Sequence, residues 1–126
     1  MSSPAVSWRE GMEGPLNVVY KVLTAAEWAD MERDGVFRGS ADDRRDGFIH
    51  LSSADQLQGT LDKHFAGASD LVLAAVAADR IAERLEWEAG RNGELFPHLY
   101  GPLPAAAVRW VRALEGGAAP PLAELE

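Results

Sequence analysis

The sequence predicts a single α+β domain, and three observations lead to this fold class. Segments dominated by β-branched and aromatic residues recur along the chain and are typical of strands. Two capping boxes, in which Ser or Thr is followed three residues later by Glu or Gln, each mark the start of a helix. Finally, 126 residues with 47% hydrophobic content suffice for the core of one domain, whereas two domains would each lack an interior.

The predicted domain spans residues 18–115 and lies between two mobile tails. Residues 1–17 carry Ser, Pro and Gly without apolar periodicity, and residues 116–126 are rich in Gly, Ala and Pro. Within the domain we expect small mixed, mostly antiparallel sheets with two flanking helices.

The N-terminal part of the domain predicts a strand, a helix and a second, short strand. Val, Tyr and Leu at 18–23 indicate the first strand. Thr24 and Glu27 form the first capping box, and the helix that it starts ends near Gly35. A loop rich in arginine and aspartate then leads to a short strand at 47–52.

The second capping box, Ser53 with Gln56, predicts a helix that ends near Gly67. The apolar residues at helical spacing, which should face the core, are Leu57, Leu61 and Phe65. Residues 71–77 are apolar on both faces, as in a strand that is covered on two sides. We therefore expect this strand in the middle of the sheet.

The remaining residues predict a hairpin and a last strand. After a brief turn at Asp79, residues 85–88 alternate apolar and acidic, and the Asn-Gly turn at 92–93 separates them from 95–100. These two segments should pair. Residues 108–114 are interpreted as the last strand, with a helix as the competing interpretation.

Composition excludes several classes of function. The absence of cysteine excludes disulfides, thiolate nucleophiles and iron–sulfur centres, and fits a reducing compartment. No apolar run reaches the roughly 20 residues of a membrane helix, and no basic segment followed by an apolar one suggests secretion, so we expect a cytoplasmic protein without a membrane partner. The net charge of −8 would repel long nucleic acids.

A local exception to the acidic balance is the loop between the first helix and the second strand. Its three arginines, which could meet a small anion, are Arg38, Arg44 and Arg45. The alternative is an ordinary solvated loop, because three aspartates accompany them: Asp42, Asp43 and Asp46.

Two strand segments carry the same polar pattern on one face. Side chains alternate across a strand, so one row is Phe48, His50 and Ser52. The matching row is Phe96, His98 and Tyr100. If the two rows are adjacent, they line a cleft suited to a flat or sugar-bearing ligand. The alternatives are a histidine that satisfies a buried carbonyl and a serine that belongs only to the helix start.

Other motifs of catalysis are missing. The sequence has no Gly-x-Ser-x-Gly elbow, no H-E-x-x-H motif and no glycine-rich phosphate loop, and its three histidines, at positions 50, 64 and 98, lack metal-ligand spacing. We expect no metal. Glu88 is the candidate catalytic carboxylate because it approaches His98 across the hairpin, although exposed glutamates such as Glu86 and Glu94 usually only add solubility.

These motifs resemble the bacterial family of domain of unknown function 952, from Val19 to about Leu114. The residues that carry the resemblance are Tyr20, Lys21, Val22, Trp28, the run from Asp46 to Ser52, Gln56, Thr60, Phe65, Glu88 and the run from Phe96 to Gly101. The resemblance implies a fold similar to the ADP-ribosyltransferases, in which two small sheets meet around a cleft that binds nicotinamide adenine dinucleotide (NAD). The segment 48–52 is also similar to the Val-His-Leu-Ser segment of RNA 2′-phosphotransferases.

Two positions depart from the transferase pattern that the resemblance implies. Lys21 stands where many transferases place a histidine or arginine, and His98 lies near the region that usually supplies the catalytic glutamate. Without that carboxylate an oxocarbenium-like state loses stabilisation.

We therefore expect a domain that binds NAD, as a substrate, or an ADP-ribosyl-type nucleotide in a cleft at His50 and His98, with transferase or glycohydrolase chemistry. The expected catalytic residues are His50, His98 and Glu88. The expected ligand-binding residues are Lys21, Arg44 and Arg45 for phosphate, Phe48 and Tyr100 for stacking, and Ser52 for hydroxyl groups. The alternatives are a non-catalytic small-ligand module and a protein-interaction domain that uses Trp8 or Trp110. The sequence leaves the oligomeric state open.

Overall fold

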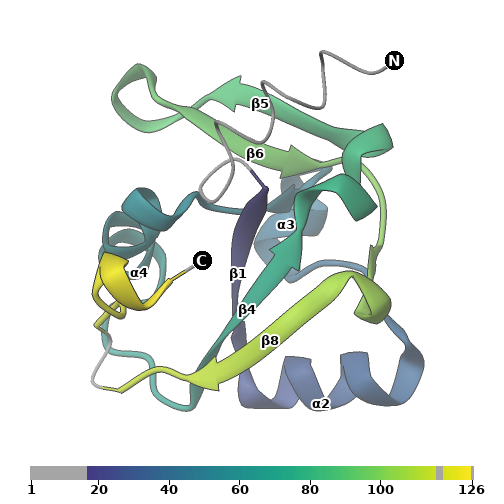
Figure 1. Cartoon of the computed structure of the whole chain (residues 1–126), viewed down its shortest axis with the longest axis horizontal. Coiled ribbons are helices and arrows are strands. Elements are labelled where there is room, and N and C mark those ends of the chain that lie inside the picture. Colours follow the sequence, from purple (N-terminus) through teal and green to yellow (C-terminus); the bar gives the residue numbers. More distant parts are fainter. Residues whose placement is uncertain (1–16, 116–117, 126) are drawn as a thin grey trace.

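The main sheet has three antiparallel strands with β4 in its centre. The computed structural model describes residues 17–115 and 118–125. The strands are β1 (Val18–Thr24), β4 (Leu71–Ala77) and β8 (Val108–Ala113), in the order β1-β4-β8 (Figure 1). The central position expected for residues 71–77 is confirmed, and the competing helical interpretation of 108–114 is wrong.

A second antiparallel sheet lies beside the first. It consists of β3 (Ile49–His50), β6 (Leu95–Leu99) and β5 (Leu85–Ala89), in the order β3-β6-β5, and the predicted β5–β6 hairpin is confirmed. Tyr20 and Ser52 join the two sheets by a pair of backbone hydrogen bonds of 2.8 and 2.9 Å. This link brings β3 and the loop that follows it against the first strand.

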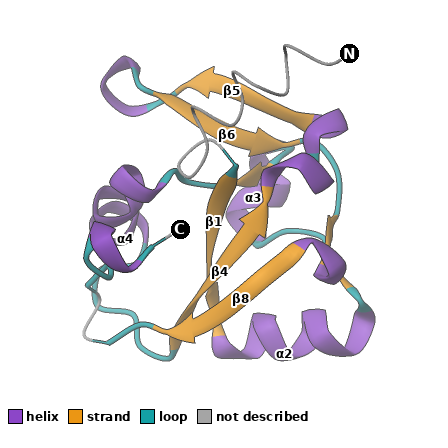
Figure 2. Ribbon diagram, viewed as in Figure 1, coloured by secondary structure: helices purple, strands orange, loops and turns teal. Residues whose placement is uncertain are grey.

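A short antiparallel pair and three helices complete the fold. The pair is β2 (Val36–Phe37) with β7 (Leu103–Pro104). The helices are α2 (Ala25–Asp34), α3 (Ala41–Asp46) and α4 (Leu57–His64). In the view of Figure 2, α2 lies below the main sheet and α4 to its left. All the pairings among the described strands are antiparallel, whereas the sequence analysis allowed a mixed sheet.

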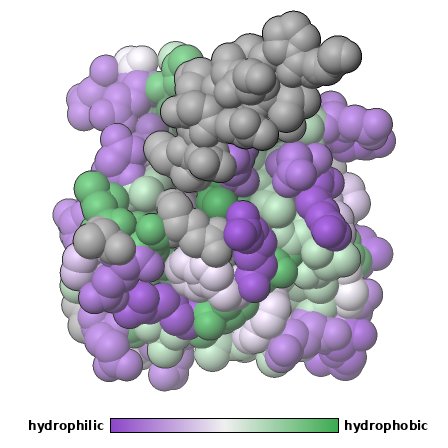
Figure 3. Space-filling model, in the orientation of Figure 1, coloured by the Kyte–Doolittle hydropathy of each residue, from purple (hydrophilic) through white to green (hydrophobic). Residues whose placement is uncertain are grey.

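The main sheet is buried on both faces. One side of β1 and β4 contributes Val19, Leu23, Ala74 and Val76 to a first hydrophobic cluster, in which α2 places Met31. The opposite side contributes Tyr20, Val22, Leu73 and Ala75 to a second cluster, which α4 covers with Leu57 and Leu61. Two-sided burial explains why β4 is apolar throughout. Hydrophilic residues lie around much of the periphery in Figure 3, as the net charge of −8 requires.

Both predicted capping boxes are present, and the structure adds a third. Thr24 and Glu27 cap α2, which ends at Gly35 in the left-handed conformation, and Ser53 with Gln56 opens the turn before α4. The third box, Ser40 with Asp43, starts α3. The sequence predicts a loop here, because five of these six residues are charged and they show no apolar stripe.

The chain ends were predicted to be mobile tails, and this stays a prediction. Residues 1–16 lie outside the described residues, and so does Trp8 of the interaction hypothesis. Residues 118–125 contact the domain, since the Ala119 amide donates to Gln58 Oε1 at 2.9 Å and Arg112 pairs with Glu124 at 3.2 Å. Trp110 is half-buried against the second cluster. No helix within the described ranges is long and apolar enough to cross a membrane.

Replacing Ser40 by alanine should destabilise the protein by about 1 kcal/mol, because the Ser40 hydroxyl accepts a hydrogen bond from the Asp43 amide at the start of α3. Urea denaturation would measure the loss. The exposed Ser69→Ala variant is the control, and equal stability of the two variants would contradict a capping role for Ser40.

Candidate functional site

The register of β3 and β6 places the two histidines opposite each other. His50 pairs with His98 across the strands, and their ring centroids lie 5.9 Å apart. The Phe48 ring stacks on His98 with a centroid distance of 3.9 Å and lies 4.7 Å from the His50 ring. The two polar rows predicted from the sequence are therefore adjacent.

A cavity of about 250 Å³, which we call the histidine groove, opens between these rows and α4. Its lining residues are Phe48, His50, Leu51, Ser52, Thr60, His64, Ala89, Gly90, Phe96 and His98. A smaller hollow of about 60 Å³ adjoins it, since the two share His50, Ser52, Thr60 and His64. In the part of the chain that the structure describes, no group of three or more His, Asp or Glu side chains could hold a metal ion.

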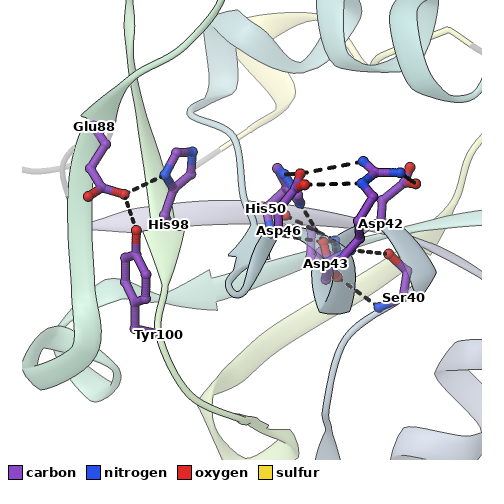
Figure 4. A network of polar contacts seen from close by, with 10 residues as sticks. Ser40, Asp42, Asp43, Asp46, His50, Glu88, His98 and Tyr100 are labelled. Carbon is purple, nitrogen blue, oxygen red and sulfur yellow. Dashed lines mark hydrogen bonds and ion pairs between the residues drawn. The ribbon is translucent and has the colours of Figure 1, made fainter.

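His50 lies between two carboxylates of α3 (Figure 4). Its Nδ1 lies 2.6 Å from Asp43 Oδ1, and its Nε2 lies 2.9 Å from Asp46 Oδ2. Both ring nitrogens of His50 therefore face a carboxylate oxygen, and at least one of them donates to its partner.

Asp43 is the centre of a buried polar network. Its side chain is 2% exposed, and the Lys21 ammonium, itself 6% exposed, lies 3.1 Å from Oδ2 and also donates to the His50 carbonyl at 3.0 Å. The amides of Ser40 and His50 donate to the same carboxylate at 2.9 and 3.1 Å. Burial alone would raise the pKa of Asp43, but the hydrogen bond with His50, the charge of Lys21 and the two amides hold this pKa far below its usual range.

His98 is oriented by a different carboxylate. Glu88 Oε1 lies 2.7 Å from His98 Nδ1, and it accepts a hydrogen bond of 2.6 Å from the Tyr100 hydroxyl. The Tyr100 hydrogen bond, followed by that of His98, lowers the pKa of Glu88, and the same contact with Glu88 raises the pKa of Tyr100. Because an ionised Glu88 accepts from Nδ1, a neutral His98 has the lone pair on Nε2, where it can accept a proton.

Four predicted site residues line the groove: Phe48, His50, Ser52 and His98. Ser52 is buried, with its hydroxyl 2.8 Å from that of Thr60. Glu88 and Tyr100 lie on the side of His98 away from His50 and outside the lining (Figure 4). Glu88 contacts the groove residue His98, and the Tyr100 ring lies 5.4 Å from that of Phe48.

The predicted phosphate ligands are not assembled at the groove. Lys21 is 5% exposed and its ammonium is committed to Asp43 and the His50 carbonyl, so its predicted phosphate contact is corrected to a structural role. Arg45 borders the smaller hollow but pairs with Asp42 and Asp46 at 2.9 and 3.1 Å. Arg44 lines a different cavity.

No pattern in the sequence assigns Asp43 and Asp46 to His50, or Thr60 and His64 to the groove. The Ser40-x-x-Asp43 spacing is itself a capping-box pattern and could have indicated α3. Asp46 and His50 are four residues apart, but no local pattern shows that they meet across the turn at Gly47.

Replacing Tyr100 by phenylalanine should raise the pKa of Glu88 toward its ordinary value, because the lost hydroxyl makes the largest lowering contribution. NMR titration of the Glu88 side-chain carboxyl would measure the shift. Arg84→Gln is the control, since the Arg84 guanidinium donates to the backbone carbonyl of Tyr100 and takes no part in the hydrogen bond of its hydroxyl to Glu88. An unchanged Glu88 titration in Tyr100→Phe would contradict the assigned hydrogen bond.

Comparisons with known proteins place these residues in a family. The family described as "Protein of unknown function (DUF952)" matches residues 22–111. The X-ray structure of protein CC0527 from Caulobacter crescentus is 45% identical, with a TM-score of 0.76 over 85% of this chain and 96% of that chain. The solution NMR structure of CC0527 is 48% identical, with a TM-score of 0.69 over 78% of this chain and 84% of that chain. No curated protein matches. The chain, which carries the paired histidines within the matched region, belongs to the DUF952 family.

Proposed function

We propose that this protein binds NAD or an ADP-ribosyl-type nucleotide in the histidine groove and cleaves or transfers at the nicotinamide ribose. One observation carries the proposal: His50 and His98 stand side by side over one groove, and a separate carboxylate orients each ring. Paired imidazoles held by carboxylates supply acid–base groups at fixed positions. An ADP-ribosyltransferase-like fold, implied by the resemblance above, remains part of this proposal.

The groove suits one end of a dinucleotide. Its volume of about 250 Å³ lies just below the range of about 300–1,000 Å³ typical of pockets for drug-sized ligands, so it would enclose a base and a ribose and leave the rest outside. The rings of Phe48 and Phe96 offer apolar surface for the base, and the hydroxyls of Ser52 and Thr60 can bond to the ribose.

The proposed reaction is hydrolysis or transfer at C1′ of the ribose. In hydrolysis, the oxygen of a water attacks C1′ while the bond from C1′ to the nicotinamide nitrogen breaks. Nicotinamide leaves with the bonding electron pair, and the water gives its proton to His98 Nε2. His50, whose two ring nitrogens face Asp43 and Asp46, would border the ribose without donating to it. An acceptor hydroxyl in place of water would give transfer.

A specific observation favours a second candidate, a binding module without turnover. The residues that line the groove include no carboxylate, and Oε1 of Glu88, outside the lining, is engaged by His98 and Tyr100. A developing positive charge on the ribose would therefore lack the close carboxylate that glycosidases provide. The module would bind the same nucleotide and release it unchanged.

One NMR experiment separates these functions. NAD is incubated with the protein, and ligand-detected spectra are recorded at once and over several hours. Saturation transfer to NAD together with growing nicotinamide signals supports the enzyme, whereas saturation transfer without nicotinamide supports the module. If neither saturation transfer nor nicotinamide signals appear, both proposed functions are wrong. The exposed Glu86→Gln variant, on the strand next to His98, is the matched control and should behave as wild type.

A further inference from the structure

A second cavity, larger than the histidine groove, lies beside α3. Its volume is about 420 Å³, and its lining residues are Arg38, Asp43, Arg44, Gly47, Phe48, Ile49, Leu99, Gly101 and Pro102. Ile49 and Leu99 alternate with His50 and His98 along β3 and β6, so the two cavities use opposite faces of this strand pair. Only Phe48 lines both.

Two exposed arginines at this cavity have no carboxylate partner among the described residues. Arg33, Arg45 and Arg112 each pair with a carboxylate. Within residues 17–115 and 118–125, the guanidinium groups of Arg38 and Arg44 have no hydrogen bond or ion pair, although acidic residues outnumber basic ones by 20 to 12. Two positive charges are thus left available at one hollow of an acidic protein.

The fold places the backbone beside Arg38 close to the helix that carries Arg44. Gly39, between Arg38 and α3, has a φ of +113°, and a Cβ there would lie 2.9 Å from Asp43 Cβ and 3.7 Å from Arg44 Cγ. The chain therefore passes so close to α3 that only glycine fits. The backbone at Arg38 is pinned against the helix that carries Arg44.

The one carboxylate of the lining does not cancel these charges. Asp43 is 2% exposed, and Lys21, His50 and the Ser40 amide satisfy its oxygens. The rest of the lining is apolar, from Phe48, Ile49, Leu99 and Pro102. A ligand that matches this cavity combines an anionic group with an apolar body.

We infer that this cavity is a binding site for a small organic anion, whose phosphate or carboxylate is held by Arg38 and Arg44 and whose apolar part lies against Ile49, Leu99 and Pro102. The inference is independent of the function proposed for the histidine groove. It rests on a different cavity and on residues that the groove does not use.

The test uses three probes with one ring: phenyl phosphate, benzoate and phenol. Each is titrated into the ¹⁵N-labelled protein, and the amide signals of Gly47 and Gly101 report on this cavity while those of Ser52 and Gly90 report on the histidine groove. We expect one or both anions to shift Gly47 and Gly101, and phenol to shift neither. The tighter of the two anions identifies phosphate or carboxylate as the preferred group.

Variants then assign the binding to the arginines. Arg38→Gln and Arg44→Gln should each weaken the binding of the preferred anion by about tenfold or more, because each variant removes a charge-assisted hydrogen bond. Arg45→Gln, on the same helix but paired with Asp42 and Asp46, should bind as wild type. Equal affinity in all three variants, shifts confined to Ser52 and Gly90, or no shift with either anion would overturn the site. Binding of inorganic phosphate as tight as that of phenyl phosphate would overturn the role of the apolar wall.

Discussion

Replacing Asp43 by alanine is expected to lower the free energy of unfolding by about 3–5 kcal/mol, the typical cost of removing one partner from a buried ion pair. The variant leaves the ammonium of Lys21, whose side chain is 6% exposed, without its carboxylate. It also strips the Ser40 and His50 amides of their acceptor. Urea denaturation at pH 7 would measure the change.

Asp42→Ala is the matched control, because this neighbouring carboxylate is exposed and its ion pair among the described residues is with exposed Arg45. Its effect should stay within about 0.5 kcal/mol. A loss for Asp43→Ala as small as this would contradict the buried network. The network would then contribute nothing to stability, and the orientation of His50 would need another cause.

The pH dependence of this contribution has a definite sign. The folded-state pKa of Asp43 lies below the unfolded value of about 3.9, so the stabilisation is complete above that value and is lost as pH falls toward the folded pKa. The contribution of the Asp43 carboxylate to the stability difference between wild type and Asp43→Asn should therefore be complete at about pH 5. This stability difference should narrow below about pH 4, which urea denaturation at a series of pH values would show.

The second large effect is expected at His98. If the proposed cleavage of NAD occurs, His98→Gln should reduce the rate of nicotinamide release by about 10²–10⁴-fold, the range that general acid–base catalysis usually contributes. Glutamine keeps a polar side chain opposite Glu88, so the fold should persist. Glu88→Gln should lose less activity, because Glu88 acts by positioning the His98 ring. NMR of the released nicotinamide measures the rates of wild type, His98→Gln and Glu88→Gln.

Stability measured in parallel distinguishes a catalytic from a structural histidine. Glu86→Gln is the control here as well, since Glu86 pairs with His98 in the strand register but is exposed and has no contact with its ring nitrogens among the described residues. Undiminished nicotinamide release by His98→Gln would contradict its role as a base. A loss of activity that merely follows a loss of stability would assign His98 to the fold.

The sequence predicts the main strands and two of the helices because their signals are local. The β-branched run of β1, the two-sided apolar run of β4 and the capping box at Thr24 each lie within a few residues. α3 could not be found from hydrophobic periodicity. It buries only Asp43, and it is held by a cap and a carboxylate network rather than by an apolar face.

The site was predicted in part for the same reason. Alternation along β3 and β6 puts His50 and His98 on matching faces, and this period is visible in the sequence. The burial of Lys21 depends on Asp43, which lies 22 positions away, and the residues around Lys21 show no pattern that predicts this burial. Tyr100 continues the row of Phe96 and His98 along the chain, but Phe48 stacks on His98 where the groove ends. The Tyr100 hydroxyl therefore lies outside the groove and donates to Glu88.

The most direct measurement is a long-range ¹H–¹⁵N spectrum of the imidazole rings, recorded before and after addition of NAD. Three histidines give a simple spectrum, and all three line one groove. The rings of His50 and His98 should shift together on addition of the nucleotide, with Nδ1 of His98 protonated throughout. Ring signals that stay unchanged at saturating NAD, or a His98 that carries its proton on Nε2 alone, would contradict a shared binding groove with an oriented base.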